Sequence, residues 1–160
     1  MRRALIVVDV QDGFLTEENQ WILPNIKRLL IEEHYDVVVE AIFHAEPGSL
    51  WEKQVKWTFP LEPTTPEIAA ALPKHTIRTV KETKSAFKGD KDLAKMLRNA
   101  HIEEVHIVGL DTNDCAFATA QESFDLGFPT YVLEACTGSS QGPEYRDAAL
   151  KILRELRMTK

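Results

Sequence analysis

Short apolar runs alternate along the chain with longer stretches in which apolar residues recur every three or four positions. The short runs are rich in β-branched residues and end at polar or turn-forming residues, as strands buried on both faces do. They predict strands at residues 3–9, 36–43, 76–80, 104–108 and 129–133. The longer stretches have helical periodicity. They predict helices at residues 21–33, 67–72, 90–100, 113–127 and 143–156.

This alternation of strands and helices predicts a single α/β domain over residues 1–160. Right-handed crossovers between successive strands give a mostly parallel sheet of five to six strands with helices on both faces. The expected architecture is a three-layer α/β/α Rossmann-like fold. In such folds ligands bind in the crevice beyond the carboxyl ends of the strands.

The composition of the chain limits the kinds of molecule to which the protein is expected to bind. A hydrophobic fraction of 44% in 160 residues is enough for one sizeable core. The formal charge of −6, without a basic stripe, argues against nucleic acid or an anionic membrane as the main partner. No apolar segment approaches the roughly twenty residues that span a bilayer, and the chain begins directly with a predicted strand. We therefore expect a cytoplasmic protein that acts on a small molecule.

Residues 105–128 predict a strand, a tight turn at Gly109 and a helix. With Thr112 or Asn113 as the N-cap, Cys115 lies in the first helical turn, where the helix dipole favours a thiolate. The carboxylates of Asp111 and Asp114 oppose this, because nearby negative charge raises a thiol pKa. A basic partner must therefore come from elsewhere in the fold.

Asp9 and Lys81 each follow or end a predicted strand, so the sheet brings them to the same edge as Cys115. A carboxylate beside a cysteine can accept its proton, and an ammonium beside both stabilises the thiolate. The backbone N–H groups of the turn at 110–115 would face a developing oxyanion. The chemistry that fits is thiolate attack on an amide carbonyl, followed by hydrolysis of a thioester.

Three segments resemble the signature blocks of the isochorismatase-like cysteine hydrolases, a family that includes nicotinamidases. They are DVQDGF at 9–14, KETKSAF at 81–87 and GLDTNDCAFATA at 109–120, and their order and spacing match as well. The resemblance implies a catalytic triad of Asp9, Lys81 and Cys115. Lys81 matches the lysine of that family, rather than Lys84, because it stands four residues before the Ser-Ala-Phe element.

The same resemblance implies further features of the turn and of the assembly. The peptide between Leu110 and Asp111 is expected to be cis, and the N–H groups of Asp111 and Cys115 are expected to form the oxyanion hole. A homodimer or higher homo-oligomer is also expected, with a lid that is minimal or supplied by a neighbouring subunit.

Nicotinamidases hold a metal with an aspartate and histidines after the second strand, where this chain reads AIFHAEPGSLW. His44 matches one ligand, but Ile42 and Leu50 stand where other ligands would be expected. We therefore predict no metal and no cofactor, with His44 as a weak metal candidate. Asp111 is acidic where a small or neutral residue is common in the family, which would disfavour anionic substrates.

Gln11, Phe14 and Phe87 are the candidates for the substrate pocket. Gln11 could instead make a turn hydrogen bond, and the two phenylalanines could be ordinary core residues. Trp51 and Trp57 are weaker pocket candidates and lie in a long aromatic loop at 47–66, of the length that is usually functional or lid-like. Cys136 has no basic residue near it and is expected to be a small core residue.

Two other functions are compatible with the sequence. Hydrolysis of a vinyl ether such as isochorismate would not need the cysteine as a nucleophile. A binding or redox-sensing thiol protein would need no turnover, although it would have no use for Asp9 and Lys81 as proton carriers.

Overall fold

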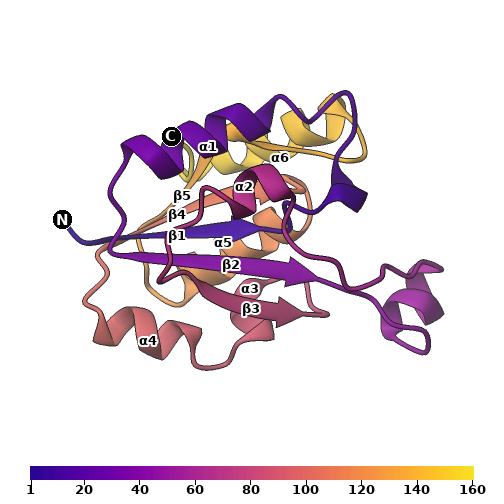
Figure 1. Cartoon of the computed structure of the whole chain (residues 1–160), viewed down its shortest axis with the longest axis horizontal. Helices are drawn as coiled ribbons and strands as arrows, with labels where there is room; N and C mark the ends of the chain where they lie inside the picture. The colour runs from indigo at the N-terminus through magenta and orange to yellow at the C-terminus, as the bar shows by residue number, and fades with distance from the viewer.

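A computed structural model describes residues 1–160 and has one five-stranded sheet, in the order β3-β2-β1-β4-β5. All neighbouring strands pair in parallel. Figure 1 shows the arrows pointing the same way, with β1 at the centre. The strands are β1 (Arg3–Val8), β2 (Val37–Phe43), β3 (Ile77–Lys81), β4 (Glu104–Leu110) and β5 (Thr130–Gly138). The predicted α/β class and the number of strands are confirmed.

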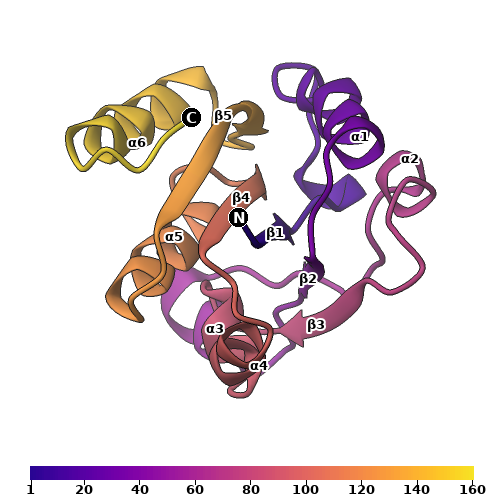
Figure 2. The same ribbon diagram turned by 90° about the vertical axis from the view of Figure 1, so that its left-hand side faces the viewer.

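Helices cover both faces of the sheet (Figure 2). One face carries α1 and α2, the other carries α3, α4 and α5, and α6 lies beside the edge strand β5. The helices are α1 (Ile22–Glu32), α2 (Pro66–Ala69), α3 (Ala86–Gly89), α4 (Leu93–Asn99), α5 (Cys115–Asp125) and α6 (Pro143–Glu155). None of them is both long and apolar enough to cross a membrane.

Two apolar cores lie on opposite sides of β1, because successive side chains of a strand point to opposite faces. Ala4, Ile6 and Val8 belong to the larger core, which includes side chains of α4, α5 and α6. Leu5 and Val7 belong to the smaller core, under α1 and α2. The five side chains are at most 1% exposed, so the sheet is fixed from both faces.

The structure differs from the sequence prediction in three local features. Helix α3 was not predicted, since its four residues are too few for a periodic pattern; the Ser85 hydroxyl caps it by accepting a hydrogen bond from the Phe87 N–H at 3.2 Å. Strand β5 extends to Gly138, five residues beyond the predicted end, because Glu134 and Thr137 interrupt the apolar run from which its end was predicted. The loop at 47–66 contains a single π-helical turn at Trp51–Val55.

The N-cap of α5 is Asp114, rather than Thr112 or Asn113 as predicted, and no side chain caps the helix. Thr112 is used elsewhere: its hydroxyl bonds to the Thr137 hydroxyl at 2.8 Å and to the Gly138 carbonyl at 3.0 Å. These bonds hold the turn after β4 against the end of β5. Cys115 consequently becomes the first residue of α5.

Gly109 permits the close approach of β4 to β1. Its φ angle is +111°, and a Cβ atom at this position would lie 2.1 Å from the Val8 carbonyl oxygen. Gly127 also has a positive φ, +93°, but a Cβ atom there would meet nothing within 4 Å. A side chain at Gly127 would meet only the strain of a positive φ angle. A side chain at Gly109 would meet the same strain and also clash with the Val8 carbonyl.

We predict that Gly109→Ala lowers the free energy of unfolding by about 3 kcal/mol or more, and Gly127→Ala by about 1 kcal/mol. Urea denaturation followed by far-UV circular dichroism measures both values. Equal losses in the two variants would contradict the role given to the contact between Gly109 and Val8.

Candidate active site

A buried ion pair joins the ends of two strands that are not neighbours in the sheet. Lys81, the last residue of β3, donates from Nζ to Asp9 Oδ2 at 2.9 Å and to the Thr83 carbonyl at 3.0 Å. The side chains of Lys81 and Asp9 are 0% and 1% exposed. Asp9 directly follows β1 and has a positive φ of 50°. Strand β2 lies between them, and the Lys81 ammonium stands 5.0 Å from the centre of the Phe43 ring.

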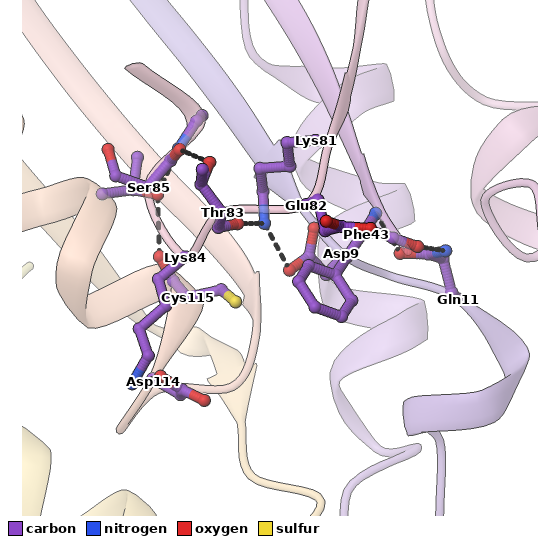
Figure 3. A network of polar contacts seen from close by, with 12 residues as sticks. Asp9, Gln11, Phe43, Lys81, Glu82, Thr83, Lys84, Ser85, Asp114 and Cys115 are labelled. Carbon is purple, nitrogen blue, oxygen red and sulfur yellow. Dashed lines mark hydrogen bonds and ion pairs between the residues drawn. The ribbon is translucent and has the colours of Figure 1, made fainter. Parts of the chain in front are cut away.

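Cys115 completes the group of residues brought together at this edge. Figure 3 shows its sulfur directed toward the Asp9 carboxylate, which also accepts the hydrogen bond from Lys81. The Cys115 side chain is buried, and its carbonyl accepts a hydrogen bond from the Thr119 hydroxyl at 2.7 Å. The structure thus places Asp9, Lys81 and Cys115 side by side, as the sequence predicts.

Burial decides the protonation of Asp9 and Cys115. It raises the pKa of Asp9 to about 6, although the Lys81 ammonium and the Cys115 thiol both act to lower it. Burial, and next the Asp9 charge, raise the pKa of Cys115 well above its ordinary value, against the opposing effect of Lys81. The helix dipole therefore does not make Cys115 a thiolate in the free protein, contrary to the trend expected from its place in α5.

One oxygen of Asp9 has no partner. Oδ2 binds Lys81, whereas Oδ1 is buried and forms no hydrogen bond. A buried carboxylate oxygen without a donor is costly, since nothing replaces the lost hydration. Oδ1 is therefore available to the proton of the Cys115 thiol that faces this carboxylate, or to a donor on a ligand.

The turn between β4 and α5 leaves three backbone N–H groups without a hydrogen bond. The peptide between Leu110 and Asp111 is cis, as expected. Among the loop bonds, Thr112 N–H donates to Gly138, and the N–H groups of Asp114 and Ala116 donate to Asp111. The N–H groups of Asp111, Asn113 and Cys115 donate none of these bonds, and the first and last of them are the two expected to form the oxyanion hole.

A small cavity with aromatic walls lies against the Cys115 side chain. Its volume is about 20 Å³, which is room for about one water molecule. A primary carboxamide has three heavy atoms, so the rings must move to admit one. The cavity is lined by Asp9, Phe14, Phe43, Trp51, Trp57, Leu110, Asp111, Asp114 and Cys115.

The aromatic walls hold one another in place. The Phe43 and Trp57 rings are stacked with centroids 5.7 Å apart, and Trp51 meets Phe43 edge-on at 5.0 Å. Phe14 stacks on Phe59 at 4.3 Å. The Trp51 indole N–H donates to the Glu82 carbonyl at 2.6 Å, which fixes this ring next to the end of β3.

Of the three residues proposed for the substrate pocket, only Phe14 lines the cavity. Gln11 is buried, but its amide pairs with the backbone of Phe43, at 2.8 and 2.9 Å, and with the Glu62 carbonyl at 3.0 Å. It therefore positions Phe43. Phe87 lies in the larger core, where it stacks on Phe128 at 6.3 Å.

Several wall residues were missed or underrated at the level of the sequence. Trp51 and Trp57 line the cavity, although Phe87 was preferred to them. Phe43 ends a buried strand, so it looked like core. Ser140 binds both carboxylate oxygens of Asp111, from its N–H at 2.8 Å and its hydroxyl at 2.6 Å, across a separation of 29 residues that no local pattern reveals.

Comparison with known proteins agrees with this arrangement. The family model described as the isochorismatase domain matches residues 3–159. The chain belongs to the isochorismatase family. YrdC of Bacillus subtilis, described as an uncharacterized isochorismatase family protein, is 30% identical over 162 residues, covering 92% of this chain and 82% of YrdC.

Solved structures of other proteins share the fold. The pyrazinamidase of Pyrococcus horikoshii in complex with zinc superposes with a TM-score of 0.80 at 26% identity, covering 100% of this chain and 98% of that one. The N-carbamoylsarcosine amidase of Thermoplasma acidophilum gives a TM-score of 0.76 at 22% identity, covering 95% and 92%.

The residues of this chain do not fit a metal site of the kind that a zinc complex implies. No group of three or more His, Cys, Asp or Glu side chains is arranged to hold a metal ion. His44 Nδ1 instead pairs with Glu46 Oε1 at 2.9 Å. Ile42 is buried and apolar, and Leu50 is 69% exposed.

We predict that Lys81→Met slows the alkylation of Cys115 by iodoacetamide at least about tenfold at pH 8, because the ammonium that lowers the pKa of this thiol is lost. Rates measured by peptide mass spectrometry include Cys136 as an internal reference, whose pKa burial raises to about 11.

Lys88→Met is the matched control, since Lys88, in α3, is exposed and pairs with Glu122 of α5. It should leave the rate at Cys115 within about twofold. A similar drop in both lysine variants would contradict a specific effect of Lys81.

Proposed function

We propose that the protein is a cysteine hydrolase that cleaves a small-molecule amide through a thioester. The observation that carries the proposal is the buried Lys81–Asp9 pair, with the Cys115 thiol facing the same carboxylate beside a small cavity. Family membership supports a hydrolase, and the amidases among the structural neighbours support C–N bonds as the target.

The first half of the reaction uses Asp9 as a base and then as an acid. As the Cys115 sulfur attacks the carbonyl carbon, its proton passes to Asp9, whose pKa of about 6 leaves it ionised at neutral pH. The N–H groups of Asp111 and Cys115 bind the oxyanion. Asp9 then protonates the leaving nitrogen, the C–N bond breaks, and ammonia or an amine departs from a thioester.

The second half regenerates the thiol. A water molecule gives a proton to Asp9 and attacks the thioester carbonyl, and the same two N–H groups bind the second oxyanion. The C–S bond breaks, and the Cys115 sulfur recovers the proton from Asp9. The carboxylic acid leaves, so one amide and one water have become one acid and one amine. Lys81 holds Asp9 in place and offsets its charge throughout.

The raised pKa of Cys115 weighs against a redox-sensing function. Oxidation by peroxide requires thiolate character and exposure, and this thiol is buried and protonated in the free protein. Proton transfer to Asp9 during attack avoids the need for a preformed thiolate.

We predict that the wild-type protein releases ammonia from at least one member of a panel of small primary amides, nicotinamide included. Cys115→Ala should lower the rate by at least about 10³-fold, and intact-mass measurement should detect an acyl adduct on the wild type. Cys136→Ala, at a buried cysteine outside the cavity, should retain the activity.

Isochorismate belongs in the same assay, followed by pyruvate release. Its cleavage by both wild type and Cys115→Ala, with no amide cleaved, would replace the amidase by an ether hydrolase. Rapid oxidation of Cys115 by peroxide, with no adduct from any amide, would favour the thiol sensor.

The pH dependence follows from Asp9. The carboxyl must be ionised to accept the thiol proton, so protonation below its pKa removes the active form. We predict that kcat/KM for a neutral amide is constant just above pH 7 and falls below pH 6, approaching about tenfold per pH unit. A stopped ammonia assay in constant-ionic-strength buffers measures the profile. A fall centred near pH 4 would contradict the role of Asp9.

A further inference from the structure

A second, larger hollow lies directly outside the small cavity. Its volume is about 440 Å³, against about 20 Å³ for the inner one. We call it the vestibule. The two share the walls Phe14, Trp51, Trp57, Asp111 and Asp114. A substrate with its carbonyl at Cys115 therefore extends the rest of its structure into the vestibule.

The vestibule walls carry negative charge and no positive charge. Its polar side chains are those of Asp111, Asp114, Thr16, Ser140 and Gln141, and no Lys, Arg or His lines it. The Asp111 carboxylate is held only by neutral donors of Ser140, so no cation offsets its charge. Asp114 pairs with Lys84 at 2.9 Å, but that ammonium belongs to an exposed side chain outside the vestibule.

Three of the remaining wall residues are aromatic, Phe14, Trp51 and Trp57, and the other two are Gly13 and Val55. Faces of Trp, Tyr and Phe rings attract cations, most strongly where water is excluded. The chain already uses two of the rings around the inner cavity in this way. The Lys84 ammonium lies 5.7 Å from the Trp51 ring centre, and the Lys81 ammonium lies 5.0 Å from the Phe43 ring centre. Trp57 and Phe14 have no such partner.

A separate observation points to a ligand in the inner cavity that the vestibule adjoins. Asp9 Oδ1, in a residue that is 1% exposed, lines the inner cavity without a hydrogen-bond partner. The NH₂ group of a carboxamide in the cavity is a donor suited to it. The site therefore offers an acceptor at its inner end and, farther out, a carboxylate among aromatic faces.

We propose that the substrate is a small amide whose other end carries a positive charge, such as a quaternary or primary ammonium, bound in the vestibule between Asp111 and the ring of Trp57, which has no cation partner within the chain. This inference rests on the proposed amidase function and specifies its substrate class. Amides with a carboxylate in the same position are disfavoured, since that group would face Asp111 without a cation to pair with.

The test uses amides that differ in charge and little else. Betaine amide carries a trimethylammonium group, 3,3-dimethylbutanamide replaces its nitrogen by carbon, and malonamate places a carboxylate there. We expect kcat/KM for betaine amide to exceed that for the neutral isostere at least about tenfold, with malonamate the slowest. Equal rates for the charged and neutral isosteres, or a preference for malonamate, would overturn the proposal.

Variants assign the preference to named groups. Asp111→Asn should lower the ratio of betaine amide to 3,3-dimethylbutanamide about tenfold, a ratio in which any general loss of activity cancels. Lys84→Met removes the cation that offsets Asp114 and should raise the ratio. Asp125→Asn, at the exposed end of α5, removes one negative charge elsewhere and should leave the ratio unchanged. A fall of the same size in Asp125→Asn would mean that net charge alone sets the preference.

Binding to Cys115→Ala keeps this inference separate from the proposed function. Isothermal titration of this variant with the two isosteres should show tighter binding of betaine amide, whether or not the wild type turns either over. Tighter binding without turnover would contradict the amidase and retain the cation site. Equal affinities would contradict the cation site and leave the amidase to be judged by the panel.

Discussion

The ion pair between Lys81 and Asp9 is the interaction on which the site depends. Each charge alone would be expensive to bury, and the attraction between them offsets that cost only when the geometry is good. The geometry is set by the sheet. Because β2 separates β1 from β3, the pair reaches across the Phe43 position, and both strands must be in register for it to form. The ion pair can therefore form only when β1, β2 and β3 are correctly paired.

Burial makes the two charges costly to place, and it also determines the protonation states of Asp9 and Cys115. Exclusion of water raises the pKa of both Asp9 and Cys115, so the free site holds a carboxylate that is ionised near neutral pH beside a thiol that is not. The aromatic walls maintain this state by leaving room for about one water. Their ring contacts and the Gln11 amide connect the segment after β2 to the residues that follow β1.

The sequence predicted what strand order and residue type determine, and failed where long-range contacts decide. The placement of Asp9, Lys81 and Cys115 at one edge of the sheet could be predicted because parallel strands bring their carboxyl ends to the same edge. This rule requires no knowledge of distances. The residues that line the cavity could not be identified by this rule. Phe43 and Phe87 both look like core from their surroundings in sequence, and only tertiary packing puts one against the cavity and the other against Phe128.

Local capping was misjudged for a related reason. Thr112 is a good N-cap residue in isolation, but its hydroxyl is used by Thr137 and Gly138, 25 and 26 residues away. Gln11 likewise was ambiguous between a turn and a ligand-binding role, and its actual partner is the backbone of a neighbouring strand. The catalytic roles of Asp9, Lys81 and Cys115 stay predictions that the proposed assays address.

The central position of β1 has a consequence for biosynthesis. β1 leaves the ribosome before the other four strands of this sheet, yet one of its two hydrogen-bonding edges is covered only by β4, about a hundred residues later. Until then an apolar strand presents unpaired N–H and C=O groups, which is a template for aggregation. The partly synthesised chain therefore depends on rapid translation or on chaperones, and premature termination between β3 and β4 yields a product with an open sheet edge.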